Sequence, residues 1–245
     1  MSDIFSISKE DILQQLKLSE QLANTIEAIA TYKIAARKAQ EVGLRVETEE
    51  LQKAADVFRL KNNLISANET LLWMKKNGFS VDDLEALVYR DVLINKLSEY
   101  LFADQVEPYF FDKKLDYTQV LFYEAILDNT DLAMELFYAL QEGEITFFEV
   151  ARQYGSDIET RRRGGYRGLV KRTDLSPELS AAMFKATPPQ LLKPIAIGKK
   201  THLVWLEEII YPVLDKSLRS QILSNLFSEW VKNQLNQMDL SRISY

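Results

Sequence analysis

Two polar side chains in this chain are well suited to chemistry, one loop acid and one histidine. Asp157 lies in the loop Tyr154–Gly168, which also holds three consecutive arginines and the glycine pair Gly164–Gly165. His202 is the only histidine, and it lies in the apolar run Thr201–Leu206. Glycine pairs permit a tight turn, which could fold the acid back into a pocket. The pattern is typical of a small polar site shared by a loop and a strand.

Each of these residues also has an interpretation without chemistry. Asp157 could cap the loop or pair with a neighbouring arginine, and His202 could be a strand histidine with a satisfied hydrogen bond. The arginines could simply be the solvated part of a surface loop. The sequence around these residues must therefore decide between the two interpretations.

The composition argues against several classes of function. The chain has no cysteine, so it can form no disulfide framework, thiolate nucleophile or zinc–thiolate site. The formal net charge of −6 argues against a nucleic-acid-binding protein, which normally presents a basic face. With 47% apolar and 27% charged residues, the 245-residue chain is expected to be globular, with one large or two smaller domains.

The elements before the loop are expected to be helical from Ser8 to about Phe102. Apolar residues recur there at three- and four-residue spacing, which is typical of helices that bury one face. Ile12, Leu13 and Leu16 are the first such group, and we expect them to form a buried stripe.

Two prolines mark the expected domain boundaries. Pro108 is expected to end the helical region, and Pro212 follows the segment that holds His202. Beyond Pro212, residues 214–238 have the spacing of one long amphipathic helix, whose apolar face must be buried somewhere. The N-terminus lacks the basic and apolar regions of a signal peptide, and no run is long enough to span a membrane. We therefore expect a cytoplasmic location.

The order of segments after Pro108 resembles the parvulin family of peptidyl-prolyl isomerases. Members of that family have a strand, two helices, a loop of the type ySxD…GGxxG, a helix with a paired apolar residue and Phe, and a strand with a histidine. The matching segments here are Tyr117–Leu127, Asp131–Gln141, Thr146–Tyr154, the loop, Ser176–Ala186 with Met183–Phe184, and Pro194–Glu207 with His202. The resemblance covers roughly residues 115–211.

The resemblance implies a proline-binding pocket made of two histidines, an acid or a cysteine, and apolar side chains, with no metal or cofactor. Its polar residues fall on Asp157, His202 and Gln119, where Gln119 takes the place of the first histidine in the opening strand. Its substrate-binding residues fall on Leu175, Leu179, Met183 and Phe184, with Arg161, Arg162 and Arg163 expected to favour an acidic residue before proline.

The helical region is similar to the N-terminal chaperone domain of SurA/PrsA-type foldases. The segments that carry this similarity are Arg37–Leu44, Thr48–Gln52, Asp56–Arg59, Glu69–Met74 and Gly78–Glu85. In that family a C-terminal helix returns to the N-terminal domain. The resemblance thus implies an α+β protein: a helical domain of residues 1–111 completed by 213–245, and an inserted parvulin-like domain of residues 112–212 with the order βαααβαββ.

Two functions follow from these resemblances. The first is a protein-folding factor that combines prolyl isomerase activity with binding of unfolded or proline-containing client polypeptides. The second is a catalytically weak or inactive parvulin-like holdase, assembly or secretion chaperone, which the loss of the first histidine at Gln119 would favour. Neither function involves nucleic acid or a membrane span.

Overall fold

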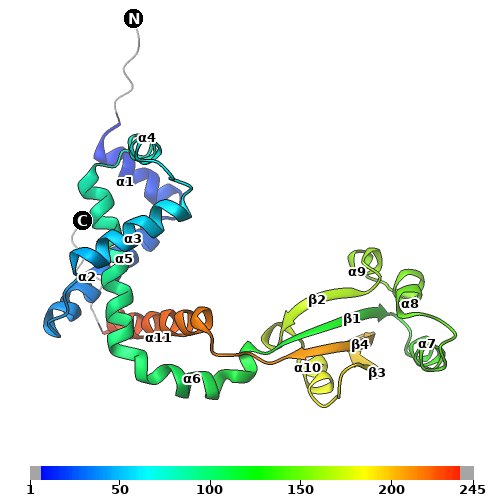
Figure 1. Ribbon diagram of the computed structural model, residues 1–245. Coiled ribbons are helices and arrows are strands. Elements are labelled where there is room, and N and C mark those ends of the chain that lie inside the picture. The colour runs from blue at the N-terminus through cyan, green and yellow to red at the C-terminus, as the bar shows by residue number, and fades with distance from the viewer. Residues whose placement is uncertain (1–6, 238–245) are drawn as a thin grey trace, which may run out of the picture. The chain divides into compact units, whose positions relative to one another are not determined.

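A computed structural model describes residues 7–237 and divides the chain into two compact units (Figure 1). Of the described residues, 7–106 and 216–237 form the helical unit and 107–215 form the second unit. The boundaries thus fall at 106 and 215, where the sequence predicted 111 and 212. Residues 1–6 and 238–245 of the predicted helical domain lie outside the described residues.

The helical unit is built from helices of the N-terminal region and one from the C-terminal region. In order they are α1 (Lys9–Leu18), α2 (Leu22–Glu41), α3 (Thr48–Lys61), α4 (Ala67–Asn77), α5 (Val81–Phe102) and α11 (Lys216–Asn236). Capping boxes begin four of them; Ser8, Ser66 and Ser80 each accept a hydrogen bond from the backbone three residues later, and Glu47 and Glu50 form the box of α3.

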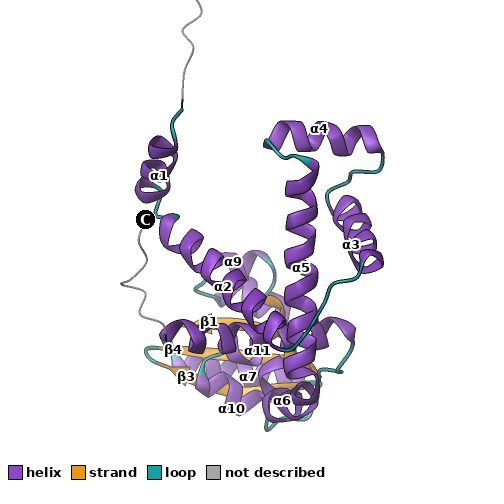
Figure 2. Ribbon diagram, turned by 90° about the vertical axis from the view of Figure 1, so that its left-hand side faces the viewer, coloured by secondary structure: helices purple, strands orange, loops and turns teal. Residues whose placement is uncertain are grey.

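The centre of the helical unit is α5, against which α2, α3 and α11 pack (Figures 1 and 2). Leu97 of α5 and Ile222 of α11 are fully buried. Ser98 Oγ donates to the carbonyl oxygen of Leu223 at 3.0 Å, and Arg219 forms a two-pronged ion pair with Glu99 at 2.6 and 2.7 Å. The C-terminal helix is therefore part of the same core as the N-terminal helices.

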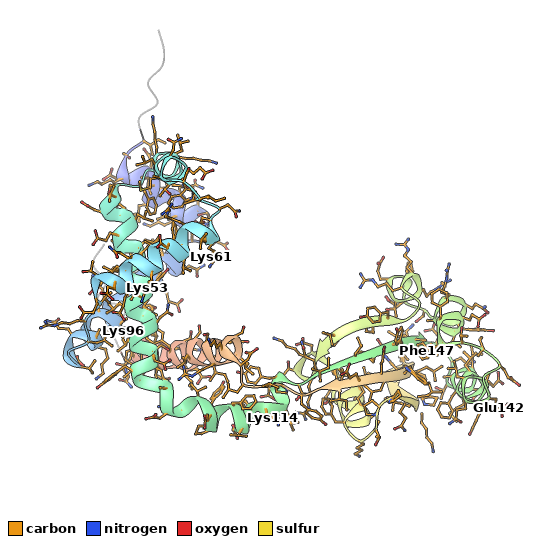
Figure 3. The ribbon with its side chains drawn as sticks, viewed as in Figure 1. Lys53, Lys61, Lys96, Lys114, Glu142 and Phe147 are labelled. Atoms are coloured by element: carbon orange, nitrogen blue, oxygen red, sulfur yellow. The ribbon has the colours of Figure 1, made fainter. Side chains whose placement is uncertain are left out.

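Helix α3 is held against α5 by an ion pair as well as by packing. Lys96 Nζ lies 2.6 Å from Glu50 Oε2 and also donates to the carbonyl oxygen of Arg45 (Figure 3). Hydrogen bonds from the Glu47 backbone and from Lys96 lower the pKa of the Glu50 carboxyl. This contact fixes the start of α3 beside α5.

The prediction of a buried stripe in the first helix is wrong. None of the described side chains of α1 is buried, and Ile12, Leu13 and Leu18 are exposed. Helical spacing shows that apolar residues share a face, but it cannot show that the fold covers that face. The described part of the unit therefore presents apolar side chains to solvent.

The second unit begins with α6 (Val106–Lys113), and Pro108 lies inside its first turn. The prediction that Pro108 ends a helix is therefore wrong; α5 ends earlier, at Phe102, and a 3-10 turn (Ala103–Gln105) follows it. Proline is tolerated in a first turn because the backbone N–H groups there have no helical partner.

The rest of the second unit has the order βαααβαββ. Its elements are β1 (Gln119–Leu127), α7 (Thr130–Glu142), α8 (Phe147–Tyr154), α9 (Ile158–Arg162), β2 (Tyr166–Lys171), α10 (Pro177–Met183), β3 (Gln190–Ile197) and β4 (Lys200–Ile210). The strands form one antiparallel sheet in the order β2-β1-β4-β3 (Figure 1). The α+β fold class predicted from the sequence is confirmed.

Each face of this sheet has its own apolar core. Ala125 and Leu127 of β1 pack with α7 and α8, whereas Val120 and Phe122 of β1 pack with α10. This division follows from the strand itself, because alternate side chains point to opposite faces. None of the described helices of the chain is long and apolar enough to cross a membrane.

Candidate functional site

The predicted site histidine contacts a buried acid on the neighbouring strand. His202 of β4 lies opposite Ile126 of β1, and its Nδ1 is 2.6 Å from Oε1 of Glu124. Glu124 is two residues from Ile126, so its side chain lies on the same face of the sheet as His202. The Glu124 side chain is only 4% exposed and that of His202 is 12% exposed. The pair is therefore nearly dry.

Arg167, near the start of β2, forms an ion pair with the other oxygen of this acid. Arg167 Nε lies 3.3 Å from Oε2 of Glu124, so each carboxylate oxygen has one partner. An ionised carboxylate only accepts hydrogen bonds, and this requires that Nδ1 of His202 carries the proton. The Nε2 atom of His202 takes no part in this contact. Burying a charge is tolerable here because Arg167 compensates it.

The same arginine connects this pair to the loop acid. Arg167 Nη1 donates to Oγ1 of Thr160 at 3.3 Å, and the amide of Thr160 donates to Oδ2 of Asp157 at 2.7 Å. Asp157 is thus the N-cap of α9. The hydrogen bonds from the Thr160 hydroxyl and amide, together with the charge of Arg167, hold the pKa of the Asp157 carboxyl below its usual value. Asp157 and His202 are joined through Thr160, Arg167 and Glu124.

The glycine pair brings the loop against this network. Gly164 and Gly165 have φ of +63° and +90°, and the amide of Glu124 donates to the carbonyl oxygen of Gly165 at 2.7 Å. A Cβ at Gly165 would lie 2.9 Å from the ring of Phe147 and 3.1 Å from the carbonyl oxygen of Glu124. Phe147 begins α8 (Figure 3). Glycine is therefore required here both for its backbone conformation and for its small size.

We expect Gly165→Ala to lower the free energy of unfolding of the second unit by about 2 kcal/mol or more. Positive φ alone costs an alanine about 1 kcal/mol, and the contact with Phe147 adds to it. Gly198→Ala is the matched control, because Gly198 has φ +59° and no atom within 4 Å of the added Cβ. Chemical denaturation followed by near-ultraviolet circular dichroism measures both. Equal losses in the two variants would contradict the close approach.

The apolar residues of the site differ in their accessibility. Leu175 and Phe184 are partly buried and pack against the α10 core, and Leu179 is 7% exposed. Met183 is fully buried within that core. The prediction that Met183 binds substrate is therefore corrected, since its side chain has no surface to offer a ligand. The other three line the same face of the sheet as the Glu124–His202 pair.

The structure places Gln119, the third predicted polar residue of the site, away from His202. Gln119 begins β1 and pairs with Lys171 and Ile210, so it lies five residues along the strand from Glu124. Five residues span about 17 Å, too far for a contact with His202. Sequence spacing alone did not establish where the strand begins. One signal was present in the sequence: Glu124 is the only charged residue of the otherwise apolar segment Val120–Leu127.

The three predicted loop arginines are directed elsewhere. Arg161 Nε donates to the carbonyl oxygen of Arg152 on α8, and Arg162 pairs with Glu159 at 3.0 Å. Arg163 is exposed. Figure 1 shows α9 beside α8 and α10 beside β3, at separate places on the sheet. The structure therefore does not bring these arginines to Leu175, Leu179 and Phe184, which together we call the apolar wall.

The described residues contain no group of three or more His, Cys, Asp or Glu side chains arranged to hold a metal ion. What the site does offer is a nearly dry polar pair and an apolar wall on the same face of a small sheet. Residues 124–208, which hold both, match a family model described as "Rotamase: PPIC-type PPIASE domain". The second unit is a parvulin-type rotamase domain. The matched segment begins at Glu124, the partner of His202.

Similarity to known proteins extends beyond the rotamase domain. The chain is 22% identical over 208 residues to the foldase protein PrsA of Oceanobacillus iheyensis, which covers 83% of this chain and 65% of that protein. A crystal structure of peptidylprolyl isomerase PrsA from Bacillus cereus is 19% identical, covering 100% of this chain and 93% of the other, with a TM-score of 0.48. A SurA-like chaperone of Campylobacter jejuni is 16% identical, covering 97% and 93%, with a TM-score of 0.40.

These structural likenesses are weak, so the assignment of the rotamase domain comes from the family model. The chain spans about two thirds of the length of its PrsA relative, 65% of it. The sequence similarity to PrsA thus extends along most of this chain, including the helical segments.

Proposed function

We propose that this protein is a folding factor that isomerises X–Pro bonds and binds unfolded segments of client polypeptides. The observation that carries the proposal is the contact of His202 with Glu124 beside Leu175, Leu179 and Phe184 within a rotamase domain. A prolyl isomerase needs polar atoms and an apolar grip on one face, and the site has both.

The reaction makes and breaks no covalent bond. The barrier to rotation about the peptide bond is about 18–20 kcal/mol, because the planar amide loses its resonance when it twists. The twisted amide is less polar than the planar one, so a dry pocket favours it over the ground state. The Phe184 face would hold the proline ring, while Nε2 of His202 lies where a polar atom of the peptide can approach. Glu124 and Arg167 keep His202 in one tautomer and orientation.

The helical unit is proposed to bind unfolded segments of the client. Between α3 and α5 lies an apolar hollow of about 270 Å³, lined by residues that include Leu51, Ala55, Leu84 and Val88. Exposed apolar side chains on α1, α3 and α4 add to this surface. Unfolded segments expose apolar side chains of their own, and such surfaces commonly mark binding sites. Clients would then be held close to the isomerase site by a second, weaker attachment.

The alternative is a chaperone whose rotamase domain binds proline segments with little or no turnover. Gln119 favours this alternative, because it stands where the resemblance expects the first histidine. Glu124 fixes His202 but, as a carboxylate, offers no donor of its own to the peptide. The two functions share the binding site and differ only in turnover. The predicted cytoplasmic location stays a prediction under both.

The combined function is tested by the refolding of a client whose slow phase is limited by proline isomerisation. We expect the whole chain to accelerate that phase at catalytic concentrations. Phe184→Ala should lose the acceleration, because the ring contact would be present in ground and transition states alike. Glu142→Gln, at an exposed position of α7, is the control and should keep it. Suppressed aggregation without acceleration would select the alternative.

A further inference from the structure

A row of side chains crosses all four strands on the face of the sheet opposite the candidate site. Tyr123 of β1 lies opposite Tyr166 of β2 and also opposite Trp205 of β4. Trp205 lies in turn opposite Leu191 of β3. Paired residues of antiparallel strands point to the same face, so these four side chains form one transverse row, which we call the aromatic row. Because Tyr123 is adjacent to Glu124 in β1, the row faces away from the candidate site.

The aromatic row has accessible surface. Helices α7 and α8 pack on one end of this face, against residues that include Ala125 and Leu127. Farther along the face, Trp205 is 37% exposed and Tyr166 is 43% exposed. Leu169 of β2, which belongs to the same face, is 55% exposed. Large apolar side chains gathered on a surface in this way commonly mark an interaction site.

The rings of the aromatic row are packed together and regularly spaced. The ring centroids of Tyr123 and Tyr166 are 5.3 Å apart, and Phe147 at the start of α8 lies 6.2 Å from Tyr123 (Figure 3). Neighbouring strands are about 4.8 Å apart, so Tyr166 and Trp205, which are two strands apart, are separated by about 10 Å. A polyproline II helix has three residues per turn and rises about 3.1 Å per residue, so prolines three residues apart are separated by about 9 Å. The repeat of such a segment therefore matches the spacing of the row.

Two exposed carboxylates border the aromatic row. Glu208 of β4 lies opposite Leu121, two residues from Tyr123 and on the same face of the sheet. Burial raises the pKa of the Tyr123 hydroxyl, and the charge of Glu207 and a hydrogen bond to it add to this shift. The carboxylate of Glu207 therefore lies beside the Tyr123 ring. This acidic border favours a partner with a positive charge over one with a negative charge.

We propose that the aromatic row binds a proline-rich polypeptide segment in the polyproline II conformation that carries a lysine or an arginine. Two prolines three residues apart would pack on Tyr166 and Trp205. The basic side chain would pair with Glu207 or Glu208. Such segments are already extended before they bind, so they lose little conformational entropy on an aromatic surface. This inference goes beyond the proposed function, because binding here needs neither the candidate site nor turnover.

The test is an NMR titration of the whole chain with the peptide acetyl-Pro-Pro-Ala-Pro-Pro-Lys-amide. The indole N–H signal of Trp205 is the readout, and the other two tryptophans, Trp73 and Trp230, lie on α4 and α11. We expect this signal to shift in the wild type. In Tyr166→Ala the affinity should fall about tenfold, because one of the two proline contacts is lost.

The acidic border is tested with a second peptide in which glutamate replaces the lysine. We expect the wild type to bind the lysine peptide about fivefold more tightly at low salt, and this ratio should fall toward one in high salt. The ratio should also be about one in the double variant Glu207→Gln/Glu208→Gln. Equal affinity of the wild type for the two peptides at low salt would overturn the role of the carboxylates.

Two variants serve as controls. Tyr138→Ala removes an exposed tyrosine of α7 and should leave the affinity unchanged. Phe184→Ala alters the opposite face of the sheet and should leave the shift of the Trp205 signal unchanged. A shift that is lost in Phe184→Ala would overturn the inference, because the peptide would then be bound at the candidate site.

Comparison of peptides on the wild type keeps the test decisive if Tyr166→Ala fails to fold. A peptide with alanine at every proline should leave the Trp205 signal unshifted, since it lacks the rigid extended conformation. An equal shift with that peptide would overturn the polyproline II recognition. A Trp205 signal that does not move with the proline peptide would overturn the whole inference and leave the proposed function standing.

Discussion

Replacing His202 with alanine is expected to lower kcat for a proline peptide by at least about tenfold while changing its affinity little. The physical reason is that the polar pair acts mainly on the twisted amide, whereas the apolar wall binds both states. Glu124→Gln should have a similar effect through His202. A neutral amide no longer fixes the Nδ1 proton and leaves Arg167 without its anionic partner.

The two variants need a control for stability, since both disturb a nearly dry ion pair. Glu208→Gln removes an exposed carboxylate from the same strand as His202 and should keep full kcat. Thermal melting of each variant separates loss of fold from loss of turnover. An unchanged kcat in folded His202→Ala would show that the Glu124–His202 pair is structural.

Deleting residues 213–245 is expected to abolish the cooperative unfolding transition of the helical unit. The deletion removes α11, and with it Ile222, the ion pair of Arg219 with Glu99, and the hydrogen bond to Ser98. The single change Ile222→Ala should lower the free energy of unfolding of this unit by about 2–5 kcal/mol. Ser224→Ala, on the exposed side of α11, should be nearly neutral.

The rotamase domain should keep its own transition after this deletion, because both of its cores are formed within residues 107–215. Differential scanning calorimetry of the truncated chain distinguishes the two units. If both transitions survive unchanged, α11 does not complete the helical core.

Hydrogen bonding from Arg219 keeps the pKa of Glu99 below its usual value. The ion pair of Glu99 with Arg219 therefore stabilises the helical unit at a pH above the pKa that Glu99 has in the unfolded chain. This stabilisation is lost as the pH falls through the lower pKa that Glu99 has in the folded protein.

The sequence predicted the order of the elements better than the position of the site within them. Turn and cap residues such as Ser80 and the pair Gly164–Gly165 act locally, so their roles could be predicted from neighbouring residues. The partner of His202 depends on the register between β1 and β4, which is set by long-range pairing. Spacing to the loop could not provide that register, and the structure pairs His202 with Glu124, five residues along β1 from Gln119.

Burial was the second property that the sequence could not provide. Met183 and Phe184 are adjacent apolar residues, yet one is buried in the α10 core and the other remains partly accessible. The apolar face of α1 has helical spacing but no cover among the described residues. In each case the outcome depends on which element packs opposite. The role of Asp157 was left open by the sequence, and the structure places it as the cap of α9.

The central claim is that this rotamase domain turns over X–Pro bonds although Gln119 stands where the resemblance expects the first histidine. Two-dimensional exchange NMR of a proline peptide measures cis–trans exchange directly, with and without a small amount of the whole chain. We predict exchange cross-peaks on a time scale of seconds or less that appear only with the protein and are lost in Phe184→Ala. The claim would be contradicted if the peptide still binds but its cis–trans exchange keeps the uncatalysed time constant of about tens to hundreds of seconds.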